Sequence, residues 1–132
     1  NYRGITSLSA CSKVFEILIN SVLFESCKHY ISTDQHGFIP KRSVATNLAQ
    51  FVSHCLQEMD AGAQVDAVYT DLKAAFDRVD HGVLLKRLEV LGVSANLIRW
   101  LKSYLTDRVM RVRIGNSESD IFNSLSGVPQ GS

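Results

Sequence analysis

Residues 65–81 read VDAVYTDLKAAFDRVDH, an apolar run that ends in an acid and continues into a turn rich in acidic and basic residues. The apolar residues of 65–72 occur on both faces of a strand, and turn-forming residues bound the run. This pattern predicts a short central strand that is covered on both faces. Asp71 would then lie at the end of the strand, where a carboxylate is costly to bury unless it is paired or bound to a cation.

Two roles for Asp71 are open at this point. Magnesium binds one or two carboxylates together with substrate phosphates, so an acid at a strand end is a candidate Mg²⁺ ligand. Alternatively, Asp71 caps the helical turn that follows it, because the first N–H groups of a helix lack partners within the helix. The acids farther along, Asp77 and Asp80, are expected to make local caps and ion pairs, and His81 is expected to be structural.

Apolar residues recur at helical spacing on both sides of this stretch. Ser43 and Ser94 precede two of the periodic segments, and serine is a favoured N-cap residue. Gly92 follows another, as glycine commonly does beyond a helix C-terminus. Polar residues with a glycine and a proline indicate a loop over 32–42. The expected helices cover residues 12–31, 43–61, 82–91 and 95–105.

Toward the C-terminal end the periodicity changes to two. Arg111 and Arg113 alternate with apolar residues over 108–114, which predicts a strand with one basic and one apolar face. Gly115-Asn116 then turns the chain toward a second short strand near 120–124. The expected order of elements is helix, loop, helix, strand, two helices, two strands and a final loop.

The composition is that of a globular chain able to bury a core. Of the 132 residues, 45% are apolar and 20% charged, and no apolar run reaches the roughly 18 residues of a membrane span. The net charge of +1 does not decide for or against nucleic acid, which needs only a local basic patch. Three cysteines without paired spacing indicate reduced thiols in an intracellular protein, and their spacing with histidines does not match that of zinc sites.

Four blocks of the chain resemble, in the same order, those of the reverse transcriptases of non-LTR (LINE-type) retrotransposons. Their residues are most similar to those of the jockey-type elements. With a further similarity at residues 100–105, WLKSYL, the resemblance covers essentially the whole chain. The four blocks are residues 1–5, NYRGI; residues 35–38, QHGF, followed by Lys41-Arg42-Ser43; residues 71–81, DLKAAFDRVDH; and residues 126–132, SGVPQGS.

The resemblance implies an α+β fold that comprises the fingers and part of the palm of a right-hand polymerase. Residues 1–62 would be fingers-like, and residues 63–132 would form part of the palm, with an antiparallel sheet and helices on one of its faces. The family's third palm block, an aromatic-Ala-Asp-Asp hairpin, does not occur in this sequence. We therefore expect an incomplete reverse transcriptase domain that is inactive by itself.

The resemblance also implies roles for particular residues. Asp71 would bind both of two Mg²⁺ ions and the Leu72 carbonyl one of them, with the remaining ligands outside this sequence. Phe76 would be the steric gate that excludes a 2′-hydroxyl and so selects dNTPs, with a plain core aromatic as the alternative. Gln130 and Gly131 lie in the block that contacts the incoming nucleotide and the templating base, unless this block is a simple connection between elements.

Basic residues are expected to contact phosphates. Lys41 and Arg42 would bind the nucleotide triphosphate, although two adjacent basic residues in a loop are often only solvated. Ile39 stands where the family usually has a basic residue, which weakens a triphosphate role for this loop. Three further arginines would contact the nucleic-acid backbone, with a solvated strand face as the alternative for the last two: Arg3, Arg111 and Arg113.

The activity implied is RNA-directed DNA synthesis. The enzyme would copy retrotransposon RNA, using an RNA template, a DNA primer, dNTPs and Mg²⁺, in the nucleus or the cytoplasm. Neither a membrane nor a stable protein partner is implied. Two alternatives come from other classes: a non-catalytic nucleic-acid-binding remnant of a decayed element, and an unrelated Mg²⁺-dependent phosphotransferase with a strand-end aspartate. A primer-extension assay on the complete protein, with and without a template, distinguishes the polymerase from a phosphotransferase.

Overall fold

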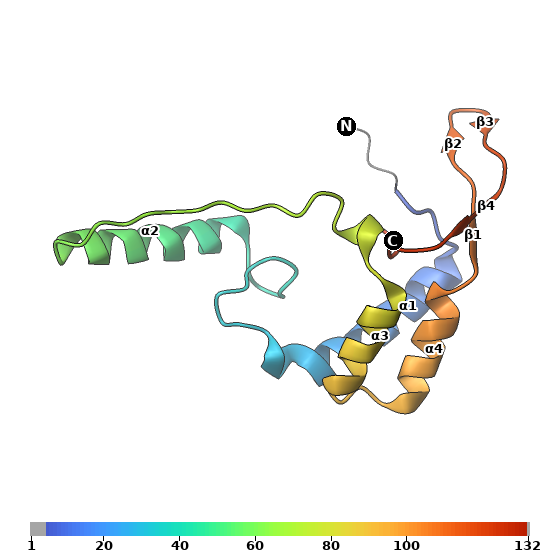
Figure 1. Cartoon of the computed structure of the whole chain (residues 1–132), viewed down its shortest axis with the longest axis horizontal. Coiled ribbons are helices and arrows are strands. Elements are labelled where there is room, and N and C mark those ends of the chain that lie inside the picture. The colour runs from blue at the N-terminus through green and yellow to red at the C-terminus, as the bar shows by residue number, and fades with distance from the viewer. Residues whose placement is uncertain (1–4, 132) are drawn as a thin grey trace. The chain divides into compact units, whose positions relative to one another are not determined.

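The computed structural model describes residues 5–131, which fall into two compact units. The first unit contains the chain up to Lys28 and from Leu72 onward, and the second contains His29–Asp71. The elements in chain order are α1 (Ala10–Cys27), η1 (Lys28–Tyr30), α2 (Val44–Asp60), η2 (Phe76–Arg78), α3 (His81–Val90), α4 (Ala95–Leu105), β1 (Arg108–Met110), β2 (Arg113–Ile114), β3 (Ser117–Glu118) and β4 (Phe122–Ser124) (Figure 1).

The four expected helices are confirmed, and so are their caps. The Ser43 hydroxyl accepts a hydrogen bond from the Thr46 backbone N–H, and the Thr46 hydroxyl accepts one from Ser43 in return, which forms a capping box before α2. The Ser94 hydroxyl caps α4. Gly92 follows α3 with φ +83°, a conformation that glycine adopts without strain. These ends form as predicted because each depends on neighbours within four residues.

The predicted central strand over 65–72 is wrong. Within the part of the chain that the structure describes, residues 63–72 have no regular secondary structure and belong to neither sheet (Figure 1). A strand requires a neighbour that pairs with its N–H and C=O groups. The two sheets described are built only from residues 108–124, so nothing in them pairs with this segment.

The C-terminal segment forms two small antiparallel sheets. β1 pairs with β4, with Arg108 opposite Ser124, and β2 pairs with β3. The predicted continuous strand over 108–114 is therefore interrupted, because its two halves pair with different partners. The predicted turn is confirmed, with Gly115 at φ +60° between β2 and β3. The fold is thus mixed, with helices and small antiparallel sheets.

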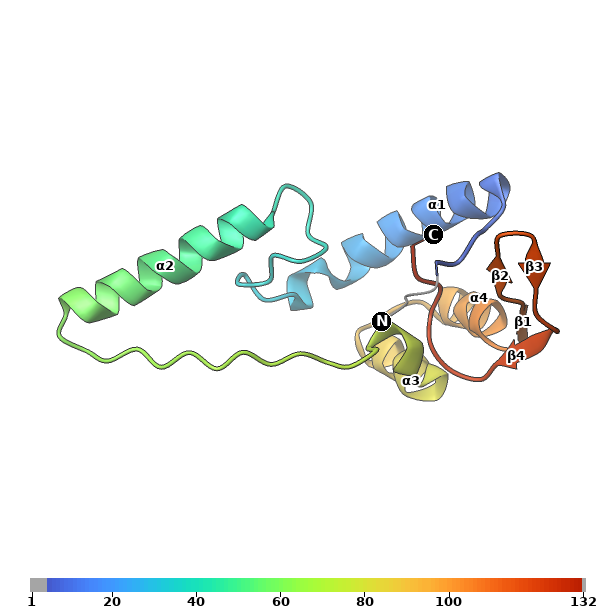
Figure 2. The same cartoon turned by 90° about the horizontal axis from the view of Figure 1, so that it is seen from above.

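Helices α1, α3 and α4 pack together in the first unit. α3 and α4 lie side by side in both views (Figure 1, Figure 2). Trp100 on α4 contacts the Phe15 ring of α1 edge-on at 5.1 Å and stacks on Tyr104 at 5.1 Å between centroids. The buried apolar side chains within residues 5–131 are few, namely Val93, Leu101 and Leu105.

Much apolar surface stays exposed on both units. Phe15 and Ile17 on α1 are 45% and 64% exposed, and Leu48 and Leu56 on α2 are 58% and 55% exposed. The apolar residues that recur along the helices are therefore mostly not covered by the described residues. None of the helices in the described part of the chain is both long enough and apolar enough to cross a membrane.

Candidate functional site

The turn that carries Phe76 is bonded directly to the loop near the C-terminal end. The Val128 N–H donates to the Phe76 carbonyl at 2.9 Å, and the Gly127 N–H donates to the Val79 carbonyl at 2.8 Å. These are backbone bonds between residues about fifty positions apart in sequence, and both lie within the first unit. The structure thus brings together the third and fourth of the blocks quoted above.

Gly127 is the closest point of this contact. It is buried and has φ +78°. A Cβ atom added here would lie 2.8 Å from the Asp77 carbonyl oxygen and 2.9 Å from the Phe76 carbonyl oxygen. Because these are backbone atoms, no side-chain rotation can relieve the overlap. Only glycine allows the loop to approach the turn this closely.

The Gly127 carbonyl accepts hydrogen bonds from two side chains. His81 Nε2 lies 2.8 Å from it, and Arg108 Nη2 donates to it at 3.2 Å. A carbonyl only accepts, so Nε2 of His81 carries the proton. The structural role expected for His81 is confirmed. Asp80 acts as the expected local cap, because its carboxylate accepts from the Val83 N–H at the start of α3.

Sequence reasoning missed Arg108. It is the first residue of the strand predicted over 108–114 and was assigned no role, and only the pairing of β1 with β4 brings it to the loop. No sequence signal marked it, because the contact joins residues 19 positions apart through the strand pairing.

The predicted nucleotide-contacting residues Gln130 and Gly131 are held by their backbone. The Thr6 N–H donates to the Gln130 carbonyl at 2.8 Å, and the Gln130 N–H donates to the Thr6 hydroxyl at 3.3 Å. A Cβ added to Gly131 would lie 3.1 Å from the Ile5 side chain. Gln130 is half-buried, and its side-chain amide makes no hydrogen bond among residues 5–131.

Asp71 is the last residue of the second unit, and Leu72 is the first residue of the first unit after it. Asp71 is exposed, and its carboxylate makes no hydrogen bond or ion pair within the described residues. The η2 turn is preceded by Ala75 and has no side-chain cap, so the alternative in which Asp71 caps this turn is not realised. The described residues hold no group of three or more His, Cys, Asp and Glu that could bind a metal.

Arg42 holds the loop at residues 32–42 in place. Its guanidinium donates to the Gln35 carbonyl at 2.7 Å and also to the Thr33 carbonyl. Nη1 makes both bonds, which leaves Nε and Nη2 for another acceptor. Lys41 is exposed beside it, with φ +66°. Both belong to the second unit.

Arg111 and Arg113 both reach Glu118 on β3. Arg111 Nη1 lies 2.6 Å from Glu118 Oε2, and Arg113 Nε lies 4.0 Å from Oε1. The shared partner agrees with the prediction that the two arginines face the same way. Glu118 neutralises part of their charge, but both remain exposed. Arg3 lies outside the described residues.

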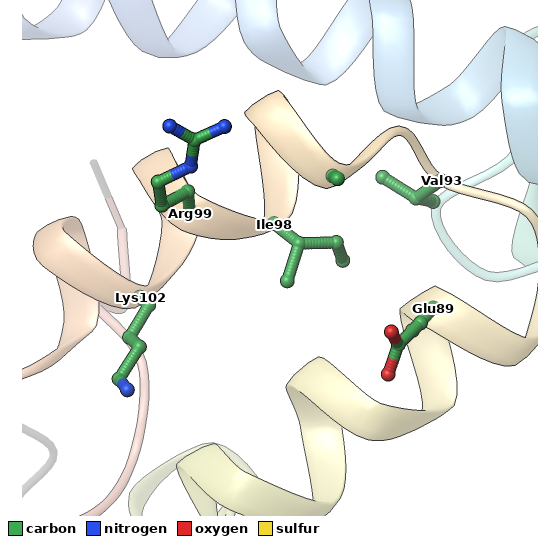
Figure 3. Close-up of a pocket in the computed structure, with 6 residues that line it drawn as sticks. Glu89, Val93, Ile98, Arg99 and Lys102 are labelled. Carbon is green, nitrogen blue, oxygen red and sulfur yellow. The ribbon is translucent and has the colours of Figure 1, made fainter.

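A shallow pocket lies between α3 and α4, away from these residues (Figure 3). Val93 and Ile98 supply apolar walls, and Arg99 and Lys102 project from α4. Arg99 is already bonded to Asn96 at 2.7 Å. None of the residues predicted from the sequence lines this pocket.

Comparison with known proteins gives a consistent result. The profile of the family described as reverse transcriptase (RNA-dependent DNA polymerase) matches residues 1–132. The chain is 37% identical over 136 residues to the probable RNA-directed DNA polymerase from transposon BS of Drosophila melanogaster. It is 35% identical over 135 residues to the probable RNA-directed DNA polymerase from transposon X-element of the same species.

A third relative is the RNA-directed DNA polymerase from mobile element jockey of Drosophila melanogaster, with 31% identity over 136 residues. Each of these alignments covers 100% of this chain but only 14–15% of the relative's own length. No solved structure matches the chain.

Proposed function

The chain belongs to the reverse transcriptase family, and we propose that it is part of an RNA-directed DNA polymerase that copies retrotransposon RNA into DNA. The expected resemblance to non-LTR elements, jockey among them, is confirmed by the relatives. The observation that carries the proposal is the backbone contact between the Phe76 turn and the Gly127 loop, because it joins two of the family-like blocks. Since the chain spans about 15% of these relatives' length, activity belongs to a complete polymerase.

In that polymerase, residues 1–62 would contribute part of the fingers and residues 63–132 part of the palm. Lys41 and Arg42 would contact the triphosphate, Arg42 through the two nitrogens that the loop carbonyls do not use. The remaining arginines, Arg3, Arg111 and Arg113, would contact the template–primer backbone. Such an enzyme would take an RNA template, a DNA primer and dNTPs, and would work in the nucleus or the cytoplasm.

Asp71 and the Leu72 carbonyl would hold Mg²⁺. The fit is chemical, since oxygen ligands suit Mg²⁺, and the exposed Asp71 carboxylate is not bonded to any described residue. Two bound Mg²⁺ ions supply activation of the primer 3′-hydroxyl and neutralisation of charge on the transferred phosphoryl group. Further ligands must come from other groups, because no acid cluster exists among the described residues. The 132-residue chain alone is therefore proposed to be inactive.

Phe76 would lie beneath the sugar of the incoming nucleotide, and Gln130 and Gly131 beside its base. The Phe76 backbone is held by Val128, and the Gln130 backbone by Thr6, so both sides of the site are anchored. A fixed backbone keeps the base of the Phe76 side chain in one place, and an aromatic ring held there can exclude a 2′-hydroxyl by steric overlap.

The test is RNA-templated primer extension by the complete polymerase carrying Asp71→Asn, with Asp66→Asn as control. Asp66 lies in the same irregular segment and bonds only Gln64 among the described residues. Asp71→Asn should lower kcat at least about a hundredfold, because a bound metal contributes several kcal/mol and about 1.4 kcal/mol is tenfold in rate. Template–primer binding should be unchanged.

An Asp71→Asn enzyme near the wild-type rate would exclude the metal role. A wild-type polymerase that binds nucleic acid without synthesis would instead indicate a non-catalytic remnant. Phosphoryl transfer without template dependence would indicate an unrelated phosphotransferase.

A further inference from the structure

Arg108, the first residue of β1, is bonded to the C-terminal segment that carries Gly127. Its Nη2 atom donates to the Ser124 hydroxyl at 3.0 Å and to the Gly127 carbonyl at 3.2 Å. Ser124 in turn donates to the Ser126 carbonyl at 2.9 Å. One guanidinium nitrogen therefore fixes the loop at two points.

The surroundings show that Arg108 is not simply a solvated strand residue. Its Nε atom is buried and has no hydrogen-bond partner among the described residues. In a solvated arginine this N–H would be hydrogen-bonded to water. The residue before it, Asp107, adopts φ +56°, which is strained for a residue other than glycine. Both features indicate that the position of the guanidinium is imposed by the fold.

Tyr104 on α4, four residues before Arg108 in the chain, is bonded to Glu16 on α1. The Tyr104 hydroxyl donates to the Glu16 carboxylate. Burial, with this bond and the charge of Glu16, raises the pKa of Tyr104 above its ordinary range, and the Arg108 charge opposes the shift.

The Gly127–Val128 peptide links Arg108 to Phe76. Arg108 and His81 donate to the carbonyl of this peptide unit, and its N–H, that of Val128, donates to the Phe76 carbonyl. Because a peptide unit is planar and rigid, its C=O and N–H turn together. Loss of the Arg108 bond leaves His81 as the remaining donor to this carbonyl, so the peptide is held less firmly and its N–H end loosens.

We propose that Arg108 is a positioning residue that holds Phe76 in place through the Gly127–Val128 peptide and thereby supports selection of dNTPs over rNTPs. The link to selection rests on the proposed polymerase function, whereas the mechanical link between Arg108 and the peptide does not. Arg108 does not contact the nucleotide in this scheme.

The experiment compares Arg108→Met and Arg108→Lys in the complete polymerase, with Arg87→Met as control. Methionine keeps an apolar stem but donates no hydrogen bond, and lysine keeps charge and donors. Arg87 is exposed at the end of α3, with no side-chain hydrogen bond among the described residues. Two quantities are measured: hydrogen exchange of the Gly127 and Val128 amides, and the ratio of kcat/KM for a dNTP to that for the matching rNTP.

In Arg108→Met, both amides should exchange about tenfold faster, as loss of a hydrogen bond to a charged group predicts. The dNTP-to-rNTP ratio should fall, while the amides of α3 and α4 keep their protection. Arg108→Lys should lie between Met and wild type, and Arg87→Met should match wild type.

Unchanged exchange at Val128 in Arg108→Met overturns the anchoring, whatever the activity. Faster exchange spread evenly over the chain also overturns it, because that is general destabilisation. Local loosening with an unchanged dNTP-to-rNTP ratio overturns the selection role. If Arg108→Met does not fold, Arg108→Lys decides: faster exchange confined to the Gly127 and Val128 amides with a lower dNTP-to-rNTP ratio supports the anchor, and wild-type exchange or uniform loosening overturns it. Absence of RNA-directed synthesis by the wild-type enzyme would refute the polymerase proposal, and the exchange result would still decide the anchoring.

Discussion

Replacing Gly127 with alanine tests whether the loop must approach the Phe76 turn as closely as the structure shows. Two effects add at this position. The backbone has φ +78°, and the left-handed conformation costs a residue with a Cβ about 1–2 kcal/mol. The new Cβ would also lie 2.8 Å from the Asp77 carbonyl oxygen, and overpacking of this kind costs about 1–3 kcal/mol. The sum is about 2–5 kcal/mol.

Gly92→Ala is the matched control. Gly92 has nearly the same backbone angle, φ +83°, but nothing lies within 4 Å of an added Cβ. It should therefore show only the conformational cost, about 1–2 kcal/mol. The difference between the two variants isolates the contact with the Phe76 turn.

The assay is native-state hydrogen exchange of the complete polymerase, which reports the free energy of local opening. Gly127→Ala should lower the opening free energy of the Val128 amide by about 1–3 kcal/mol more than Gly92→Ala lowers that of the amides at the end of α3. The KM for dNTP should rise in Gly127→Ala alone. Equal losses in the two variants would show that the close approach does not exist in solution, and the site geometry would have to be abandoned.

Three further predictions concern other parts of the chain. Phe76→Val should lower the dNTP-to-rNTP ratio about tenfold or more, since steric overlap with a 2′-hydroxyl is removed; an unchanged ratio would make Phe76 an ordinary packing residue. Tyr104 should ionise above its ordinary pKa of 10.0. Its contribution to the free energy of unfolding is therefore complete below that pH and is lost as the pH rises through the raised pKa. Ultraviolet titration should lose a late-ionising component in Tyr104→Phe, and loss of the bond to Glu16 should destabilise the first unit by about 1 kcal/mol. The 132-residue chain alone should bind an apolar dye, unfold with weak cooperativity and extend no primer, because so few of its apolar side chains are buried; a sharp transition without dye binding would contradict this.

The helices and the family were determined by the sequence alone. Each helix depends on bonds between residues four apart and on caps such as Ser43 and Ser94, so a local pattern is sufficient to predict it. The family depends on ordered blocks of residue types, which comparison with known proteins confirmed. The sequence also predicted that Asp80 makes a local cap and that His81 is structural. It did not predict the partner of His81, the Gly127 carbonyl.

Only the tertiary structure decided the rest. The run at 65–72 has the composition of a strand, yet a strand forms only where another strand lies beside it, and the described residues provide none. The same reason applies to the contact between Gly127 and Asp77, and to the two bonds that Arg108 makes to the loop. These contacts join residues far apart in sequence, and their geometry follows from how α4, β1 and β4 pack rather than from any local pattern.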